Sequence, residues 1–447
     1  MKKYESFQPM GLPWLSQIPH HWSISRNKNV FEESKETVGE NFSRYTLLSL
    51  TLRGIIPRDV SSGKGKFPQS FDTYKKVDVG DMAFCLFDID ETPRTVGLSE
   101  HQGMLTGAYN IFHVKNINPQ YINYYYLSLD IAKAMKPLYT GLRKTIGIDT
   151  FMGTKIPVPP REEQNQIVRY LDWQTSKINR LIAAKKQHIQ VLREQQQKLI
   201  CEVITKGLHS DVDYKDSHIA WIGDIPNHWL AIRCKYLFRE RDEQSKEGME
   251  THLSMSQKYG LVPDSQLDER RMLSESYAGG KLCYRDDLVL NRLKAHLGVF
   301  ALAPQFGVIS PDYTVLIPNT ERIIPSFGEM VLKSALCRRE LRVRVRGIIE
   351  GFWRLYTDDF YTIYLPVPPI EEQKEIMQHI DAQSKKNAAL ENAVNREIEL
   401  LHELRTRLIS DVVTGQIDVR SIEVPDFELV GELADEAEEP EDEMEVE

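Results

Sequence analysis

The sequence lacks any long uninterrupted run of apolar residues, although 41% of its 447 residues are hydrophobic. A membrane-spanning helix needs about 20 consecutive, predominantly apolar residues. The first residues, MKKYESFQPMGLPW, contain two lysines with no apolar run behind them, which is unlike a secretory signal. We therefore expect a cytoplasmic protein with no membrane partner.

Cysteine is also scarce. The five cysteines are Cys85, Cys201, Cys234, Cys283 and Cys337. Their odd number and wide spacing match neither a disulfide framework nor a zinc ribbon. We expect reduced thiols that are mostly buried.

The signatures of the common catalytic sites are missing. The sequence has no HExxH zinc motif, no GxSxG nucleophile turn and no GxxxxGK[ST] phosphate loop. Ser310-Pro311-Asp312-Tyr313 resembles the base-clamping tetrapeptide of amino-methyltransferases, but it has Asp where that motif has Pro, and no glycine-rich cofactor loop precedes it. Its residues favour a turn before a strand. The sequence predicts a chain that is not an enzyme and binds no metal or cofactor.

Positive charge is in deficit overall, but only because of one segment. The formal net charge is −9, yet residues 423–447 contain 13 Asp or Glu and no Lys or Arg. Residues 1–422 therefore carry 56 basic against 52 acidic residues, a balance of +4. A segment so acidic, with few aromatics and repeated Glu-Glu and Glu-Asp pairs, cannot bury enough surface to offset its ordering entropy. We expect an acidic disordered tail over 423–447.

What the sequence does contain is an internal repeat. Three segments recur at offsets of 207 to 209 residues: WLSQIPHHW (14–22) as WIGDIPNHW (221–229), PVPPREEQ (157–164) as PVPPIEEQ (366–373), and LICEVITKG (199–207) as LISDVVTGQ (408–416). Between these landmarks the copies diverge strongly. The chain is therefore a tandem duplication of a module and a helix, with parts at 1–156, 157–209, 210–365, 366–422 and 423–447.

Each PVPP segment predicts an extended approach to a long helix that starts near residue 161 or 370, with Glu-Glu-Gln at its positive end. Both helices carry a heptad seam. Its apolar members are Ile178, Ile182, Ile189, Leu192, Leu199, Val203, Val394, Ile398, Leu401, Leu408 and Val412. Lys185, Gln196 and Arg405 interrupt it, so neither seam suits a homodimer. We expect the two helices to pair with each other; the alternative is two separate helices, each packed on its own module.

The modules have the pattern of mixed α/β domains. β-like runs at 109–114 and 313–317 are bounded by Gly and Pro, and helical stretches at 121–136 and 326–346 accompany them. Arginines interleaved with aromatics favour DNA, because the guanidinium fork can bind a guanine edge. A solvated helix face is the alternative. The candidate DNA-binding residues are Arg53, Lys64, Lys66, Arg143, Lys144, Arg292, Lys294, Arg346 and Arg354.

The order of these motifs, with NRLKAHLG (291–298) and SPDY (310–313), resembles the specificity subunit of type I restriction–modification enzymes over residues 11–420. The resemblance implies that the modules are two target-recognition domains, each reading one half of a bipartite target in double-stranded DNA. It implies that the repeated helices form an antiparallel coiled coil with pseudo-two-fold symmetry, the spacer that sets the gap. The first module departs from the pattern, because CLFDIDETPR (85–94) stands where the second has NRLKAHLG.

The resemblance also implies partners. Two methyltransferase subunits would dock on the scaffold and use S-adenosylmethionine for adenine-N6 methylation, and two restriction subunits would use ATP and Mg²⁺ to cut DNA. Other interpretations are a free-standing methyltransferase or nuclease, a coiled-coil scaffold with no nucleic-acid partner, and an orphan DNA-binding protein without a restriction complex.

Overall fold

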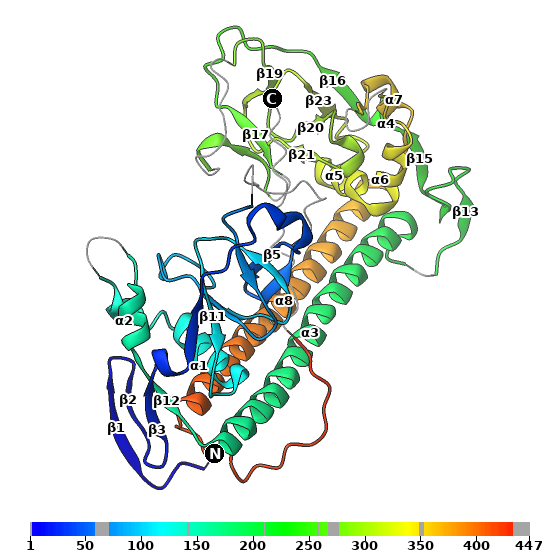
Figure 1. Cartoon of the computed structure of the whole chain (residues 1–447). Coiled ribbons are helices and arrows are strands. Elements are labelled where there is room, and N and C mark those ends of the chain that lie inside the picture. Colours follow the sequence, from blue (N-terminus) through cyan, green and yellow to red (C-terminus); the bar gives the residue numbers. More distant parts are fainter. Residues whose placement is uncertain are drawn as a thin grey trace. The chain divides into compact units, whose positions relative to one another are not determined.

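The computed structural model describes residues 2–58, 71–140, 144–209, 211–256, 259–266, 277–347 and 353–431 (Figure 1). The chain divides into two compact units. Unit 1 comprises residues 1–187 and 394–447, and unit 2 comprises residues 188–393. Each unit holds one module, the first part of the long helix that follows it and the last part of the other long helix. The boundaries of the units therefore differ from those of the parts expected from the sequence landmarks. The first part of each long helix belongs with the module that precedes it, and the last part belongs with the other module.

Unit 1 is built on a four-stranded antiparallel sheet with the order β4-β11-β8-β9, accompanied by two-stranded sheets. The strands are β1 (Phe7–Leu12) with β2 (Leu15–Pro19), β3 (Ser23–Arg26) with β12 (Lys155–Val158), β4 (Phe31–Ser34), β11 (Asn110–Val114), β8 (Met82–Phe84), β9 (Val96–Leu98), β5 (Leu48–Thr51) with β6 (Gly54–Pro57), and β7 (Lys75–Val77) with β10 (Gly103–Leu105). The helices are α1 (Pro119–Ile131), α2 (Ile148–Gly153) and the first part of α3 (Arg161–Lys206).

Unit 2 repeats this topology, with a four-stranded sheet in the equivalent order β16-β23-β20-β21. The strands are β13 (Tyr214–Asp216) with β14 (Asp224–Pro226), β15 (Leu230–Arg233) with β24 (Tyr364–Val367), β16 (Phe238–Arg241), β23 (Tyr313–Pro318), β20 (Leu288–Asn291), β21 (Phe300–Leu302), β17 (Leu253–Ser256) with β18 (Gly260–Pro263), and β19 (Lys281–Cys283) with β22 (Gly307–Ile309). The helices are α4 (Cys234–Leu237), α5 (Pro325–Lys333), α6 (Ala335–Arg342), α7 (Thr357–Tyr361) and the first part of α8 (Ile370–Val413). The duplication thus extends through the interior, where the two sequences no longer resemble each other.

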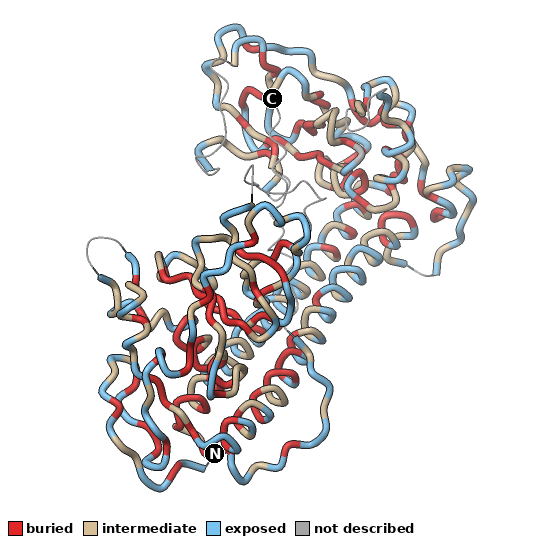
Figure 2. The backbone as a smooth tube through the Cα atoms, viewed as in Figure 1, coloured by how far each residue is buried: buried red, intermediate tan, exposed pale blue. Residues whose placement is uncertain are grey.

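One of the two inner strands of each main sheet, β8 in unit 1 and β20 in unit 2, is apolar at consecutive positions because both of its faces are buried. Every residue of β8 is buried, as are Leu288, Val289 and Leu290 in β20 (Figure 2). The two cores are filled differently. Unit 1 packs aromatic rings against one another, with the Phe84 and Phe151 centroids 4.8 Å apart, whereas unit 2 uses mainly aliphatic side chains. The same topology therefore tolerates two different core fillings.

The elements predicted from the sequence are largely present. The two β-like runs are β11 and β23, and the long helices begin at Arg161 and Ile370, as expected. The helix predicted over 121–136 ends early, at Ile131, and the one predicted over 326–346 is two helices. Ser334 divides them, because its side chain accepts a hydrogen bond from the Cys337 N–H at 3.2 Å and so starts α6.

The disordered tail expected from residue 423 is wrong for residues 423–431, which lie as an extended strap along α3. The Asn179 side chain donates to the Val430 carbonyl at 2.8 Å, and the Ser176 hydroxyl accepts from the Val430 N–H at 3.0 Å. Just upstream, Gln166 donates to the carbonyls of Val419 at 3.0 Å and Ile422 at 2.6 Å. These bonds involve the strap's backbone, so its acidic composition did not reveal them. Residues 432–447 lie outside the described residues.

The expectation of reduced, mostly buried thiols is confirmed. All five cysteines are free thiols; four are buried and Cys201 is half-buried. Burial raises the pKa of the Cys283 thiol to about 12. Within the described ranges, no helix is long and apolar enough to cross a membrane.

Candidate nucleic-acid interface

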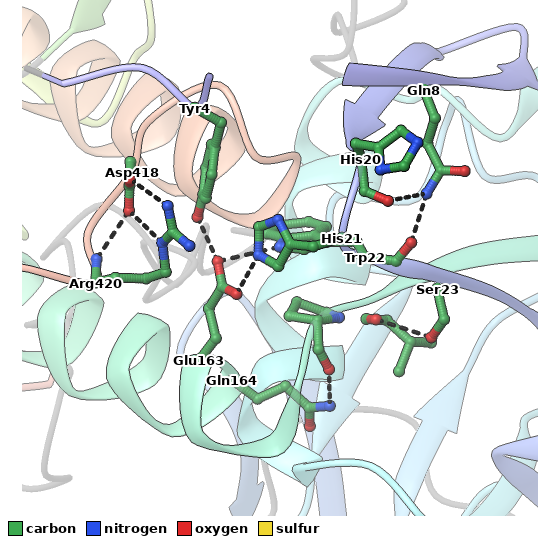
Figure 3. Close-up of polar contacts among 12 residues, drawn as sticks. Tyr4, Gln8, His20, His21, Trp22, Ser23, Glu163, Gln164, Asp418 and Arg420 are labelled. Carbon is green, nitrogen blue, oxygen red and sulfur yellow. Dashed lines mark hydrogen bonds and ion pairs between the residues drawn. The ribbon is translucent and has the colours of Figure 1, made fainter. Parts of the chain in front are cut away.

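The repeated His-Trp pair of each module binds a glutamate at the start of a long helix. In unit 1 the Trp22 indole N–H donates to Glu163 Oε1 at 3.1 Å, and His21 Nε2 lies 2.7 Å from Glu163 Oε2. The Tyr4 hydroxyl donates to the same carboxylate at 2.6 Å (Figure 3). Burial, and then the hydrogen bond to Glu163, raise the pKa of Tyr4. Glu163 is itself buried, so these donors compensate its desolvation.

Unit 2 makes the same contact. The Trp229 indole N–H donates to Glu372 Oε2 at 2.9 Å, and His228 Nε2 lies 2.8 Å from the same oxygen. The sequence had indicated only that Glu-Glu-Gln suits a helix N-terminus. The His-Trp pair and the glutamate recur together, at nearly equal offsets of 207 and 209 residues, and this was the signal that could have predicted their contact.

The glutamine after each of these glutamates ties the long helix to the rest of its module. Gln164 donates to the Pro159 carbonyl at 2.8 Å and accepts from the Asn118 N–H at 2.8 Å, where α1 begins. Gln373 donates to the Pro368 carbonyl at 2.9 Å and accepts from the Ile324 N–H at 2.8 Å, where α5 begins. Both recurring motifs therefore form one structural clamp.

The end of the other long helix reaches this clamp in each unit. Gly207 follows α3 and packs against Trp229, whereas Gly415 follows α8 and packs against Pro19 and Trp22. Both glycines have positive φ, 75° and 73°, as expected just past a helix C-terminus. A Cβ at Gly415 would lie 2.3 Å from the Pro19 ring. The clamp thus joins a module to both long helices.

The two long helices run antiparallel within each unit. In unit 1 Arg405 donates to the Asn179 side chain at 3.0 Å and Lys185 pairs with Glu397. In unit 2 Arg193 lies 3.3 Å from Glu391, and Gln196 donates to Ser384 at 2.9 Å. The alternative of two separate helices is therefore wrong.

The polar residues that interrupt the predicted seam, Lys185, Gln196 and Arg405, each bond to the opposite helix. Such pairs specify register in coiled coils. Of the apolar seam positions, Ile178, Ile182, Ile189, Val203, Val394, Ile398, Leu408 and Val412 are buried, and Leu192, Leu199 and Leu401 are half-buried.

In unit 2 the structure brings three of the candidate DNA-binding arginines together around two turns. Arg292 donates to the Asp312 carbonyl at 2.6 Å, and Arg354 lies 3.7 Å from the Asp312 carboxylate. The backbones of Arg346 and Arg354 exchange two hydrogen bonds of 2.8 Å, and the Arg346 side chain pairs with Asp359. Arg346 and Arg354 are about 68% and 43% exposed at their side chains, against 25% for Arg292.

The two motifs beside these arginines are turns. Asn291 accepts hydrogen bonds from the N–H groups of Leu293 at 3.1 Å and Lys294 at 3.2 Å, which places Lys294 at the end of the NRL turn. In the SPDY segment the Tyr313 N–H donates to the Ser310 carbonyl at 3.1 Å. This is the turn before a strand that the sequence predicted.

In unit 1 the candidates Arg53 and Lys144 flank one loop, 85–95. Arg53 is exposed in the turn between β5 and β6, beside Leu52, whose carbonyl accepts from Arg94 at 3.0 Å. Lys144 lies 3.3 Å from Asp90 and also pairs with Glu91. Lys64, Lys66 and Arg143 lie outside the described residues.

The buried carboxylate of Asp130 holds the same loop in place. Asp130 accepts from the Thr95 N–H at 3.0 Å and from the Lys133 ammonium at 2.9 Å. The segment that departs from NRLKAHLG is therefore held by an arrangement of its own. Among the described residues, no group of three His, Cys, Asp or Glu side chains could hold a metal ion.

Comparison with known proteins agrees with this architecture. Residues 103–191 match the family model described as the type I restriction modification DNA specificity domain. The chain is 21% identical over 439 residues, 91% of its length and 96% of the relative's, to a putative type I restriction enzyme MjaX specificity subunit from Methanocaldococcus jannaschii. It is 22% identical over 290 residues, 61% of its length and 64% of the relative's, to the MjaVIII specificity subunit from the same organism.

The fold has a solved counterpart. A chain from a structural study of complex assembly and conformational transition in the type I R-M system superposes with a TM-score of 0.59 at 15% identity, covering 90% of this chain and 99% of that one. That likeness shows the fold alone, whereas the family model and the two relatives show similarity in sequence. Both the family model and these relatives make the chain similar to the specificity subunits of type I restriction–modification enzymes.

Proposed function

We propose that this chain is the DNA sequence-recognition subunit of a type I restriction–modification complex, with each module reading one half of a bipartite target. The observation that carries the proposal is the repetition of one strand order, each time clamped by the same Trp-Glu contact to the same antiparallel helix pair. Proteins with two-fold symmetry read targets whose half-sites mirror that symmetry. The helix pair is then the spacer that sets the gap between half-sites.

Two methyltransferase subunits dock on this scaffold in the proposed complex and bring S-adenosylmethionine for adenine-N6 methylation. Two restriction subunits bring ATP and Mg²⁺ for cleavage. The chain itself is non-catalytic and binds none of these cofactors. The names of the relatives, as subunits of restriction enzymes, support these partners.

The arginines divide into two roles under this proposal. Arg292 is a positioning residue, because its guanidinium donates hydrogen bonds to the Asp312 and Pro311 carbonyls. Arg346 and Arg354 contact DNA, since exposed ion pairs such as theirs contribute little energy and can be exchanged for phosphate or base contacts. Lys294 in unit 2 and Arg53 and Lys144 in unit 1 are placed in the same role, together with Lys64, Lys66 and Arg143.

The decisive experiment is co-expression with a cognate methyltransferase subunit in a host lacking other adenine methylation, followed by methylome sequencing. The expected result is N6-methyladenine at a target of two short half-sites separated by a fixed gap. The purified chain alone is expected to show no methylation or cleavage. Activity of the isolated chain, or a single uninterrupted target, would contradict the proposal.

A further inference from the structure

In unit 1 the phenol side chain of Tyr124 is buried beside a set of polar side chains. The hydroxyl of this residue donates to Asp172 Oδ1 at 2.6 Å, and the Gln120 and Thr175 side chains lie close to the same hydroxyl. The Tyr124 side chain is buried between α1 and α3. The Asp172 side chain therefore satisfies this buried hydroxyl, with two further polar side chains beside it.

Two pairs of contacts identify the equivalent place in unit 2. The N–H groups of Asn118 and Ile324 donate to equivalent glutamines of the clamp. Ser128 and Ser334 each donate to the carbonyl three residues earlier, both at 2.7 Å. Positions in α1 therefore correspond to positions 206 residues later, and positions in the long helices to positions 209 residues later.

At the corresponding positions of unit 2 the tyrosine is replaced, whereas the residues around it are still polar. The counterparts of Asp172, Thr175 and Gln120 are Asp381, Ser384 and Ser326, all polar, whereas the counterpart of Tyr124 is Met330. A methionine has no ring and no hydroxyl to reach these groups.

Unit 2 is hollow at this position. A pocket of about 470 Å³ is lined by Ser326, Met330, Met377, Ile380, Asp381 and Ser384, among others. Its volume lies in the range of about 300 to 1,000 Å³ found for ligand sites. All three polar counterparts therefore line an open space where unit 1 places a phenol ring.

We propose that this pocket, the phenol pocket, binds a hydroxyphenyl group whose O–H donates to Asp381 and whose ring packs against Met330 and Met377. Thioether sulfurs are adaptable and contact aromatic rings favourably. Ser384 is already oriented by the hydrogen bond from Gln196 at 2.9 Å, so part of the floor is preorganised.

The charges at the pocket balance, because Lys333 and Arg338 line it together with Asp381 and Glu329, and Glu329 pairs with Lys333 at 2.6 Å. Asp381 pairs with Lys385 at 2.7 Å, but an exposed ion pair contributes little energy, so this carboxylate can still accept the phenol O–H.

A hydroxyphenyl group can come from a free phenol or from a tyrosine side chain. Ligand-observed NMR on the full chain, without DNA or partner subunits, tests the shared chemistry with p-cresol and toluene. We expect p-cresol to bind about fivefold or more tightly than toluene, because only p-cresol offers the hydroxyl. Equal affinities for p-cresol and toluene, or no binding of p-cresol, would overturn the proposal. N-acetyltyrosinamide distinguishes the sources: binding supports a tyrosine side chain, and its failure beside p-cresol binding supports a free phenol.

Two substitutions at Met330 test whether p-cresol binds in the phenol pocket. Met330→Tyr restores the residue of unit 1, so it should fill the pocket, abolish p-cresol binding and raise the melting temperature. Met330→Leu is the matched control, which should retain binding. In the reverse direction, Tyr124→Met should create a second p-cresol site in unit 1.

Persistent p-cresol binding by Met330→Tyr would show that the phenol binds elsewhere and would refute the site. If Tyr124→Met fails to fold, the Met330→Tyr and Met330→Leu pair still decides the question. Since none of these measurements involves DNA, their outcome is independent of the proposed recognition function.

Discussion

The indole of Trp229 donates its N–H to Glu372 at 2.9 Å across 143 residues of sequence. Glu372 lies in the first turn of α8, and Trp229 immediately precedes β15. This hydrogen bond thereby joins the first part of the second module to the start of α8, the helix that follows the module.

Removing the acceptor should destabilise unit 2. Glu372→Leu leaves the Trp229 N–H, in a fully buried side chain, without this partner, which costs about 1 to 3 kcal/mol. Chemical denaturation followed by tryptophan fluorescence measures the change. The control is Glu371→Gln, at a neighbouring side chain that is 80% exposed, which should change stability by less than about 0.5 kcal/mol. Equal effects of the two substitutions would contradict the coupling.

The recurring residues predicted the overall organisation because they make local structure at both copies. Pro366 and the Glu-Glu-Gln after it specify where α8 begins, and the heptad spacing specifies which face is apolar. That the end of α3 meets Trp229 through Gly207 could not be predicted, because heptad periodicity says nothing about which module lies at a helix terminus. Arg292 shows a second limit. Its residue type suits DNA, but its environment, a turn of carbonyl oxygens, depends on contacts some 20 residues away.

The strap and the residues after it should behave differently on deletion. Removing 432–447 takes away 10 Asp or Glu and no Lys or Arg, so methylation should persist while nonspecific DNA binding tightens as repulsion falls. Removing 419–447 also takes away the strap, leaves Asn179 and Ser176 without these partners, and should lower the melting temperature of unit 1. Differential scanning calorimetry and filter binding of unrelated DNA measure the two effects. Identical melting temperatures for both deletions would show that the strap contributes nothing.

The exposed arginines should separate from Arg292 in their effect on DNA binding. Arg346→Gln and Arg354→Gln remove phosphate or base contacts, so each should weaken binding, and a lost phosphate contact flattens the salt dependence by about 0.9 log units per log unit of salt. Arg292→Gln should instead lower stability and leave the salt slope unchanged. Fluorescence anisotropy of the assembled complex at several salt concentrations provides the measurement. If neither of the first two substitutions changes the affinity or the salt slope, these arginines are not in the interface.

The modules should be separable readers. Replacing residues 210–365 by the corresponding module of a relative, while keeping the His228-Trp229 pair and the clamp glutamate, should change one half-site and leave the other unchanged. The reason is that each module packs within its own unit and the clamp residues are common to both. Methylome sequencing reports both half-sites, and a change in both or in neither would contradict modular reading.

The helix pair should act as a ruler for the gap between half-sites. Seven residues inserted after His188 in α3 and seven after Ala393 in α8 leave the cross-helix bonds of both units intact, since Lys185–Glu397 lies on one side of the insertions and Arg193–Glu391 on the other. A heptad keeps the seam in phase and adds about 10 Å along the axis. With a rise of about 3.4 Å per base pair, the gap should lengthen by up to about three base pairs while both half-sites stay the same. Seven residues inserted in α3 alone are the control, because they break the register and should abolish methylation. A functional double insertion with an unchanged gap would rule out the ruler.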